Sequence, residues 1–200
     1  PVVAIPGSNA AGDILQLNYT DEVERHDGDT LTLATRVGLP IGAGGFVSLS
    51  AQFRDRDPTQ RSGADPRRQY PTVGDPRELT FDRFSHGYGD GKTTDYNLFA
   101  NAGMDIGTFE LYAFGSYGIR DGIGAGFYRR ANDARNRDFA ASTATFVPYY
   151  PNGFLPKIQS LIEDVSGAVG VRGDLGSWSA DLSVVYGSNQ LDYKTVDSFN

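Results

Sequence analysis

Apolar and polar residues alternate with a period of two along most of this chain. Seven runs show the pattern, and each would place apolar side chains on one face of an extended strand and polar side chains on the other. The runs cover residues 15–19, 31–39, 47–53, 96–106, 109–119, 165–175 and 178–186. Two-faced strands of this kind are typical of antiparallel sheets, so the pattern predicts an all-β fold.

Tight and long connections also alternate along the chain. Glycine-containing tight turns are expected at 42–45, 107–108 and 176–177. The other connections are long, from about residue 54 to 94 and from about 120 to 163. Loops of roughly 40 residues are uncommon in a compact soluble domain. They are typical of outer-membrane barrels, which have short periplasmic turns and long extracellular loops.

Aromatic residues fall where such a barrel would meet its two interfaces. An inner girdle would consist of the residues that directly follow the tight turns, Phe46, Phe109 and Trp178. An outer girdle would consist of Phe53, Tyr96, Tyr117 and Tyr186. At a strand tilt of about 40° the two girdles would span most of an apolar band about 25 Å tall. The polar strand face would then line the interior, with the charged residues Arg36, Arg54, Asp105, Glu110, Arg172, Asp174 and Asp181.

Composition and charge exclude several classes of protein. The 200 residues suit one domain, and the absence of cysteine excludes a disulfide framework, a thiolate zinc site and a cysteine nucleophile. The net charge of −7 leaves no basic stripe for a phosphate backbone, so no nucleic-acid partner is expected. No stretch approaches about 18 apolar residues, which excludes a membrane-spanning helix but not a membrane-spanning strand.

Both ends of the chain look cut. It begins at Pro1 without a methionine or a charged-then-apolar leader, and it stops at Asn200 soon after an alternating run. We therefore expect a processed or partial chain. Residues 1–12 match no pattern. Apolar residues at 155–165 have helical spacing, and the sequence leaves open a short helix or an irregular loop that buries them.

No arrangement of residues indicates catalysis or a cofactor. His26 and His86 are the two histidines, and they fall on separate predicted loops without metal-ligand spacing. Solvated loop histidines are the favoured interpretation. Two close acid pairs offer the clustered carboxylates that calcium prefers, with turn residues as the favoured alternative. These pairs are Asp27 with Asp29 and Asp55 with Asp57. We predict a protein that is not an enzyme and uses no cofactor.

The richest polar and aromatic clusters lie in the long loops. Aromatic rings mixed with Arg and Asn offer stacking faces, cation–π contacts and forked donors, which sites for polar organic ligands use. The same side chains could instead fold the loops back on themselves, because many Asp partners are close in sequence. The candidate ligand-binding residues are Arg67, Arg68, Tyr70, Phe127, Tyr128, Arg129, Arg130, Tyr149, Tyr150 and Phe154.

Several short segments in a fixed order carry a family resemblance. They are residues 38–46 (GLPIGAGGF), 53–59 (FRDRDPT), 97–103 (NLFANAG), 110–117 (ELYAFGSY), 125–130 (AGFYRR), 150–156 (YPNGFLP) and 181–187 (DLSVVYG). With these segments, the stretch from about Asp29 to the end resembles TonB-dependent outer-membrane receptors. Such receptors close a barrel of about 22 strands around an N-terminal plug and import scarce ligands with energy from the inner membrane.

The resemblance implies an architecture and a role for this chain. Residues 1–200 would belong to one antiparallel transmembrane β-barrel domain, contributing about seven or eight strands, with the plug domain not present. The chain would supply barrel wall and extracellular loops for the import of a ligand such as a ferric siderophore, in the outer membrane of a Gram-negative bacterium. Its implied partners are outer-membrane lipid and lipopolysaccharide, a small-molecule or siderophore ligand, and the TonB energy-coupling complex through parts outside this chain.

Three other interpretations stay open. The first is a passive porin or small closed barrel of eight strands, in which the strands at Leu15 and Leu182 would pair. The second is a soluble secreted β-sandwich that binds glycans through its loop aromatics. The third and least favoured is a hydrolase that uses Asp and Glu pairs in its loops.

Overall fold

A computed structural model of the chain describes residues 2–6, 14–19 and 24–199. Of the unassigned stretch 1–12, only 2–6 fall within the described residues. The elements are β1 (Val2–Ala4), β2 (Leu17–Tyr19), β3 (Thr30–Ile41), β4 (Gly45–Arg56), η2 (Pro76–Leu79), β5 (Lys92–Ile106), β6 (Phe109–Ala125), η3 (Ala134–Asn136), β7 (Lys157–Leu175) and β8 (Trp178–Val196).

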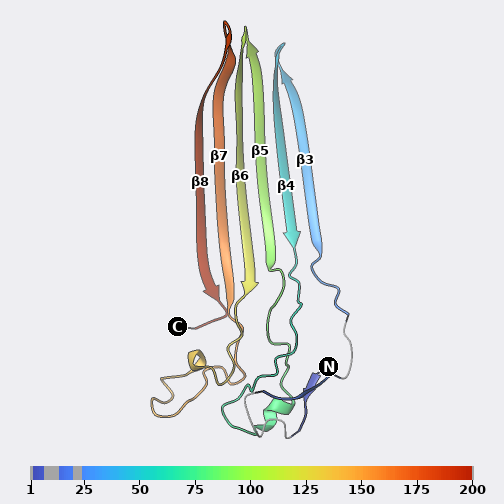
Figure 1. The fold of residues 1–200 in the computed structure, drawn as a ribbon, viewed down its shortest axis with the longest axis vertical. Coiled ribbons are helices and arrows are strands. Elements are labelled where there is room, and N and C mark those ends of the chain that lie inside the picture. Colours follow the sequence, from blue (N-terminus) through green and yellow to red (C-terminus); the bar gives the residue numbers. More distant parts are fainter. Residues whose placement is uncertain (1, 7–13, 20–23, 200) are drawn as a thin grey trace.

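Strands β3 to β8 form one antiparallel sheet in sequence order, which confirms the predicted all-β class. The three tight turns lie together at one end of the sheet, and the long loops lie together at the other (Figure 1). Strands β1 and β2 pair with each other in a separate small sheet. None of the described helices has both the length and the apolar content needed to cross a membrane.

Most of the apolar residues of the six long strands share one face of the sheet. Directly paired residues point to the same side of an antiparallel sheet, so a row of partners reveals the composition of a face. One such row is Val37, Leu49, Ala100, Gly115, Gly167 and Tyr186. A row on the opposite face is Asp105, Glu110, Arg172 and Asp181. We call these the apolar face and the polar face.

Charges on the polar face neutralise one another across strands. Asp95 of β5 lies between two guanidinium groups and is almost fully buried. It accepts hydrogen bonds from Arg54 of β4, at 2.9 Å from Nε and 2.8 Å from Nη2, and from Arg120 of β6. Arg36 of β3 donates to the Ser48 hydroxyl at 3.0 Å. Ion pairing between neighbouring strands therefore allows this face to carry many charges.

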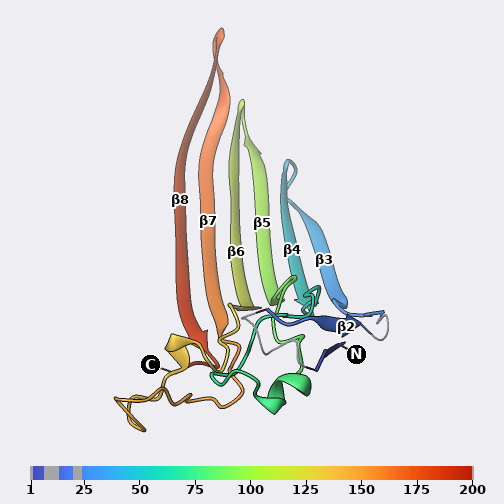
Figure 2. The same cartoon turned by 60° about the horizontal axis from the view of Figure 1, so that its bottom comes forward.

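The hairpins are staggered along the strand direction, as Figure 2 shows. At the tight-turn end, Gly45 is paired with Met104, and β5–β6 continues for two further residues to the Ile106–Phe109 pair. Phe109 is paired with Gly173, and β7–β8 continues for two further residues to Leu175 and Trp178. Each hairpin thus extends two residues beyond the one before it.

The aromatic residues at the loop side follow the same stagger. Phe53 of β4 is paired with Tyr96 of β5, which is paired with Ile119 of β6. Ile119 lies two residues past Tyr117 in the direction of the long loops. Tyr117 is paired with Val165 of β7, which is paired with Ser188 of β8. Ser188 lies two residues past Tyr186 in the same direction. Between the first strand residue after each tight turn and the outer aromatic residue, the apolar band therefore spans eight residue steps on β4, β6 and β8, and the two boundaries drawn through these residues are parallel and oblique to the strands.

No layer of the described chain covers the apolar face. Leu49 is 52% exposed, Leu111 is 39% exposed and Val184 is 70% exposed. The edge strands β3 and β8 pair with no further strand among the described residues, so the sheet is open. The largest fully buried side chains, Gln69, Glu78, Arg83 and Asn136, all belong to the long loops. The packed core of this chain is therefore in its loops and not under its sheet.

Three sequence predictions need correction. The run at 15–19 does not join the large sheet; Leu15 is buried and donates its N–H to Pro66 in the first long loop. Residues 157–165 are part of β7, so the helical spacing indicated neither a helix nor a loop there. Phe46 lies on the polar face, because Gly45 occupies the apolar position opposite Met104.

The long strands also extend further than their alternating cores. The loops consequently shorten to residues 57–91 and 126–156. Beyond the outer aromatic residues both faces become mixed, as in the row of Leu31, Asp55, Thr94, Asp121, Leu161 and Asp192. Period two cannot detect strands there, because neither face is uniformly apolar.

Candidate functional site

The two long loops pack together into one body, which we call the loop layer (residues 57–91 and 126–156). Asn132 donates its N–H to the carbonyl of Gln69 at 3.0 Å, and Arg130 Nη1 donates to the carbonyl of Arg68 at 2.8 Å. The Tyr70 hydroxyl donates to the Asn152 side chain at 3.0 Å. These bonds join segments more than 60 residues apart in sequence, so the loop layer has a defined tertiary structure.

A buried ion pair organises the first loop. Arg83 Nη2 and Glu78 Oε2 lie 2.7 Å apart, and both side chains are fully buried. The other oxygen of Glu78 accepts the backbone N–H groups of Gln69 and Tyr70, at 2.7 and 2.9 Å. A buried charge is tolerated only when it is paired and hydrogen-bonded, and this carboxylate has both kinds of partner.

His86 belongs to the same packed region, and its side chain is 26% exposed, so it is partly buried and not the fully solvated loop histidine that the sequence predicted. Arg67 Nη2 lies 3.0 Å from His86 Nε2, so this nitrogen accepts and the neutral ring carries its proton on Nδ1. Burial lowers the pKa of His86, and this effect outweighs the nearby carboxylate of Asp65. Arg67 also forms a two-pronged pair with Asp65 at 2.8 and 2.9 Å. His26, in contrast, is exposed.

Half of the predicted ligand-binding residues serve this internal packing. Tyr70 is buried, its ring meets Phe81 edge to face, and the Arg77 guanidinium covers it at 4.0 Å. Tyr128 packs between Phe81 and His86, and its hydroxyl donates to the Asn152 carbonyl. The residues engaged in loop packing are Arg67, Arg68, Tyr70, Tyr128 and Arg130.

The other predicted residues lie in or beside a pocket of about 700 Å³, which we call the loop pocket. It lies between the second long loop and the loop-side ends of β7 and β8, and Ile158 and Tyr193 reach it from the polar face. Phe127, Arg129 and Phe154 line it directly. The loop pocket therefore opens on the side of the sheet that carries the ion-pair rows.

Backbone pairing and one buried amide shape the loop pocket. Arg129 and Phe154 exchange two backbone hydrogen bonds of 2.8 Å. The fully buried Asn136 side chain donates to the carbonyl of Tyr150 at 2.8 Å and accepts its N–H at 2.9 Å. The wall beside the pocket is a cluster of aromatic rings, Tyr149, Tyr150, Phe154 and Phe199.

Three arginines line the loop pocket in different states. Arg135 forms a two-pronged pair with Asp133 at 2.9 and 3.0 Å. Burial raises the pKa of Asp133, but hydrogen bonds from the Arg135 side chain and backbone outweigh it and leave that pKa below its ordinary value. Arg137 donates to the carbonyl of Thr143 at 2.8 Å. Within the described part of the chain, the Arg129 guanidinium makes no hydrogen bond or ion pair.

Sequence reasoning missed several residues of the loop pocket. Phe139, Tyr193 and Phe199 line it, but none is among the ten predicted ligand-binding residues. The position of Tyr193 could have been predicted from the period of a β-strand. Counting in steps of two along β8 from Asp181 places Tyr193 on the polar face, beyond Tyr186 and next to the loops.

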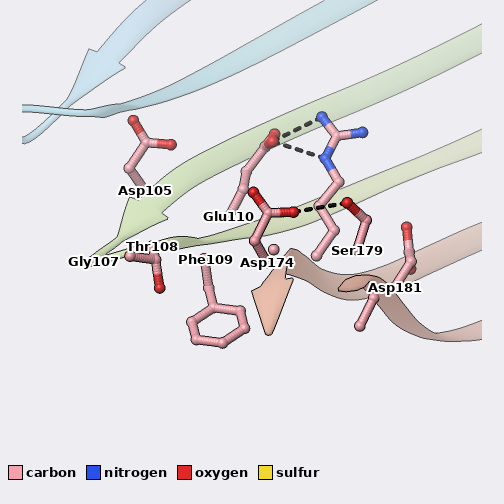
Figure 3. Close-up of a pocket in the computed structure, with 11 residues that line it drawn as sticks. Asp105, Gly107, Thr108, Phe109, Glu110, Asp174, Ser179 and Asp181 are labelled. Carbon is pink, nitrogen blue, oxygen red and sulfur yellow. Dashed lines mark hydrogen bonds and ion pairs between the residues drawn. The ribbon is translucent and has the colours of Figure 1, made fainter. Parts of the chain in front are cut away.

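A second recess, of about 480 Å³, lies at the tight-turn end of the polar face (Figure 3). Dashed lines in Figure 3 join Glu110 to the Arg172 guanidinium, at 2.8 Å, and Asp174 to Ser179, at 2.7 Å. The Phe109 ring points to the opposite side of the strand from Glu110. Asp181 accepts the Tyr112 hydroxyl at 2.8 Å. Three of the carboxylates that line this recess, Glu110, Asp174 and Asp181, therefore have hydrogen-bond partners on neighbouring residues or strands.

Three of the four carboxylates in the two acid pairs lie near cationic side chains. Lys92 Nζ lies 4.0 Å from an Asp55 oxygen and 3.6 Å from an Asp57 oxygen. Asp27 pairs with Arg61 at 2.7 Å and accepts the backbone N–H of Gln60. Among the described residues no group of three or more His, Cys, Asp or Glu side chains is placed to hold a metal ion.

No protein-family model matches the chain, and comparisons with curated proteins and with solved structures likewise return no match. The geometry of the sheet and of the loop layer is therefore the basis for inferring function.

Proposed function

We propose that the six-stranded sheet is part of the wall of a transmembrane β-barrel in a Gram-negative outer membrane. The apolar face contacts lipid and lipopolysaccharide, and the polar face lines a water-filled passage. The loop layer lies outside the cell and captures a ligand. By resemblance, the complete barrel is a TonB-dependent active importer of a scarce ligand such as a siderophore, and this chain contributes wall and loops.

The oblique apolar band is the observation that carries this proposal. A stagger of two residues per hairpin is about 6.7 Å along the strands for about 9.6 Å across them. These values give a tilt of about 35° between the strands and the normal to the band. Transmembrane barrels have strand tilts of about 35–45°. Eight residues at this tilt rise about 22 Å, which is close to the height of the apolar belt of an outer-membrane barrel.

The rival folds demand contacts that the described residues do not make. A soluble sandwich needs a second layer over Leu49, Leu111 and Val184, which are all exposed. A closed eight-stranded barrel needs the strand near Leu15 to pair with β8, whereas β2 pairs with β1. An open sheet in lipid requires partner strands at β3 and β8, because lipid cannot satisfy backbone groups.

Spin labelling tests which solvent meets each face. The chain has no cysteine, so single cysteines can be placed at 182, 183, 184 and 185 of β8 and labelled with a nitroxide. When the complete barrel protein is refolded into lipid vesicles, labels at 182 and 184 should collide with oxygen, and those at 183 and 185 with a water-soluble nickel chelate. A soluble sandwich would shield 182 and 184 from both reagents, and a water-exposed sheet would give no alternation.

Active import needs a separate test, because a passive porin would share the same wall. Cells that display the complete protein should lose ligand accumulation when the proton-motive force is collapsed, while surface binding persists. Accumulation that is insensitive to an uncoupler would support the porin and exclude energy-coupled import.

A further inference from the structure

The loop pocket differs in charge from the rest of the molecule. The chain carries a net charge of −7, yet none of the residues that line this pocket is acidic and three are arginines. Arg129 and Arg137 lie on the same limb of the second long loop, where they are bridged to Phe154 and Pro148 of the returning limb, and Arg135 belongs to η3 between them. The pocket is therefore a local positive site on an acidic protein, and it favours an anion.

Donors remain available in this pocket. Arg135 is paired with Asp133, whereas the Arg129 guanidinium makes no hydrogen bond or ion pair with the described residues and acts on the Asp133 charge only at longer range. Arg137 Nε is buried and also lacks an acceptor, although Nη2 of the same side chain is bonded to Thr143. Because that nitrogen is enclosed by protein, the half-buried Arg129 guanidinium is the donor that an incoming anionic oxygen can meet.

The remaining lining is aromatic. Phe127 and Phe139 are mostly exposed, and so is Tyr193, which leaves their ring surfaces accessible. The Arg137 guanidinium already covers the Phe139 ring at 4.8 Å, which shows that cations and rings share one surface here. A volume of about 700 Å³ lies within the range of pockets that hold small organic ligands.

We propose that the loop pocket binds an organic anion that carries an aromatic ring, such as an aryl carboxylate. Arg129 pairs with the anionic group, and the ring packs against Phe127 and its aromatic neighbours. As the ligand class of an importer this inference rests on the proposed function, but the binding itself does not.

The probes are 1-naphthoate, its uncharged analogue 1-naphthamide, and cyclohexanecarboxylate, which keeps the charge without an aromatic ring. Binding is measured by calorimetry on the complete barrel protein refolded into zwitterionic vesicles, with empty vesicles subtracted. Naphthoate should bind at least tenfold more tightly than either analogue. Equal affinity for naphthamide, or no binding of naphthoate at millimolar concentration, would overturn the proposal.

Variants assign the binding to the pocket. Arg129→Gln should weaken naphthoate at least tenfold, and Arg129→Lys should restore part of the loss because it keeps the charge. Phe127→Leu should weaken naphthoate severalfold and leave cyclohexanecarboxylate unchanged. Arg172→Gln removes the same charge at the far end of the sheet, so it should leave binding unchanged. Equal losses in Arg129→Gln and Arg172→Gln would show a nonspecific charge effect and contradict the assignment.

Spin-label accessibility on the same preparation reports membrane insertion independently. If label accessibility alternates as expected but naphthoate does not bind, the proposed ligand site is wrong and the membrane-spanning sheet is supported. If naphthoate binds but label accessibility does not alternate, the membrane-spanning sheet is wrong and the ligand site is supported.

Discussion

Glu78 is the side chain on which the first long loop depends most. It neutralises Arg83 at 2.7 Å and accepts two backbone N–H groups while fully buried. Glu78→Gln would leave the Arg83 charge buried without a counterion, at a cost of about 3–5 kcal/mol. We expect limited proteolysis to cut within residues 57–91 of this variant much faster than in the parent protein.

A matched control is available for that experiment. Lys157 pairs with Asp197 at 2.8 Å, but both side chains are well exposed, so Lys157→Gln should cost less than about 1 kcal/mol. Cleavage of Glu78→Gln at the parental rate would show that the buried pair does not hold the loop.

Tyr128 gives the loop layer a spectroscopic marker. Burial raises the pKa of Tyr128 to about 12, with smaller effects from Tyr70 and Asp65. Because the folded state keeps this proton longer than an unfolded chain with a tyrosine pKa near 10 does, the stability it contributes is present below about pH 10 and is lost as pH rises towards 12. The tyrosinate absorbance at 295 nm should therefore rise in two stages, and Tyr128→Phe should reduce only the later one. A titration in Tyr128→Phe identical to that of the parent would contradict the assignment.

At the scale of elements, close packing of aromatic rings over glycine couples β6 to its neighbour β7. A Cβ atom added at Gly170 would overlap the Tyr112 ring, whose hydroxyl donates to Asp181 on β8. Gly170→Ala should force this ring aside and lower the free energy of unfolding by about 1–3 kcal/mol in micelles. Gly187→Ala on β8 meets no atom within 4 Å and should change it by less than about 0.5 kcal/mol. Equal stability of the two variants would rule out this coupling.

Local rules identify the elements of this fold where one face is uniformly apolar. Alternation located all six long strands, and glycines located the three tight turns, because both signals depend only on neighbouring residues. The rules fail where side-chain character is mixed. Residues 157–165 continue β7 past the apolar band, and Phe46 follows a glycine that already occupies the apolar position.

The candidate site was predictable only in part, for a different reason. Phe127, Arg129 and Phe154 line the loop pocket, whereas Tyr70 and Tyr128 hold the loops together. Both groups have the same local composition. Their roles are decided by contacts between segments far apart in sequence, which no periodicity encodes.

At the scale of the whole molecule, the position of the apolar band makes a directional prediction. Leu182 lies midway between Trp178 and Tyr186, so it should sit at the centre of the bilayer. Leu182→Arg should weaken insertion by about 2–4 kcal/mol, whereas Ser183→Arg on the polar face should have little effect. The emission of Trp178, the single tryptophan, reports partition between urea and vesicles. Similar effects of the two substitutions on insertion would indicate that the apolar face, on which Leu182 is exposed, contacts water and not lipid.

The location of the packed core in the loops has a consequence for biogenesis. If the wall spans the membrane, the ion pair of Arg83 with Glu78 stands on the far side of the lipid from the tight turns. Moving a folded loop layer with buried charges through the hydrocarbon core would cost much free energy. Both long loops must therefore cross the membrane unfolded. The loop pocket would then form last, at the cell surface, after the sheet has inserted into the membrane.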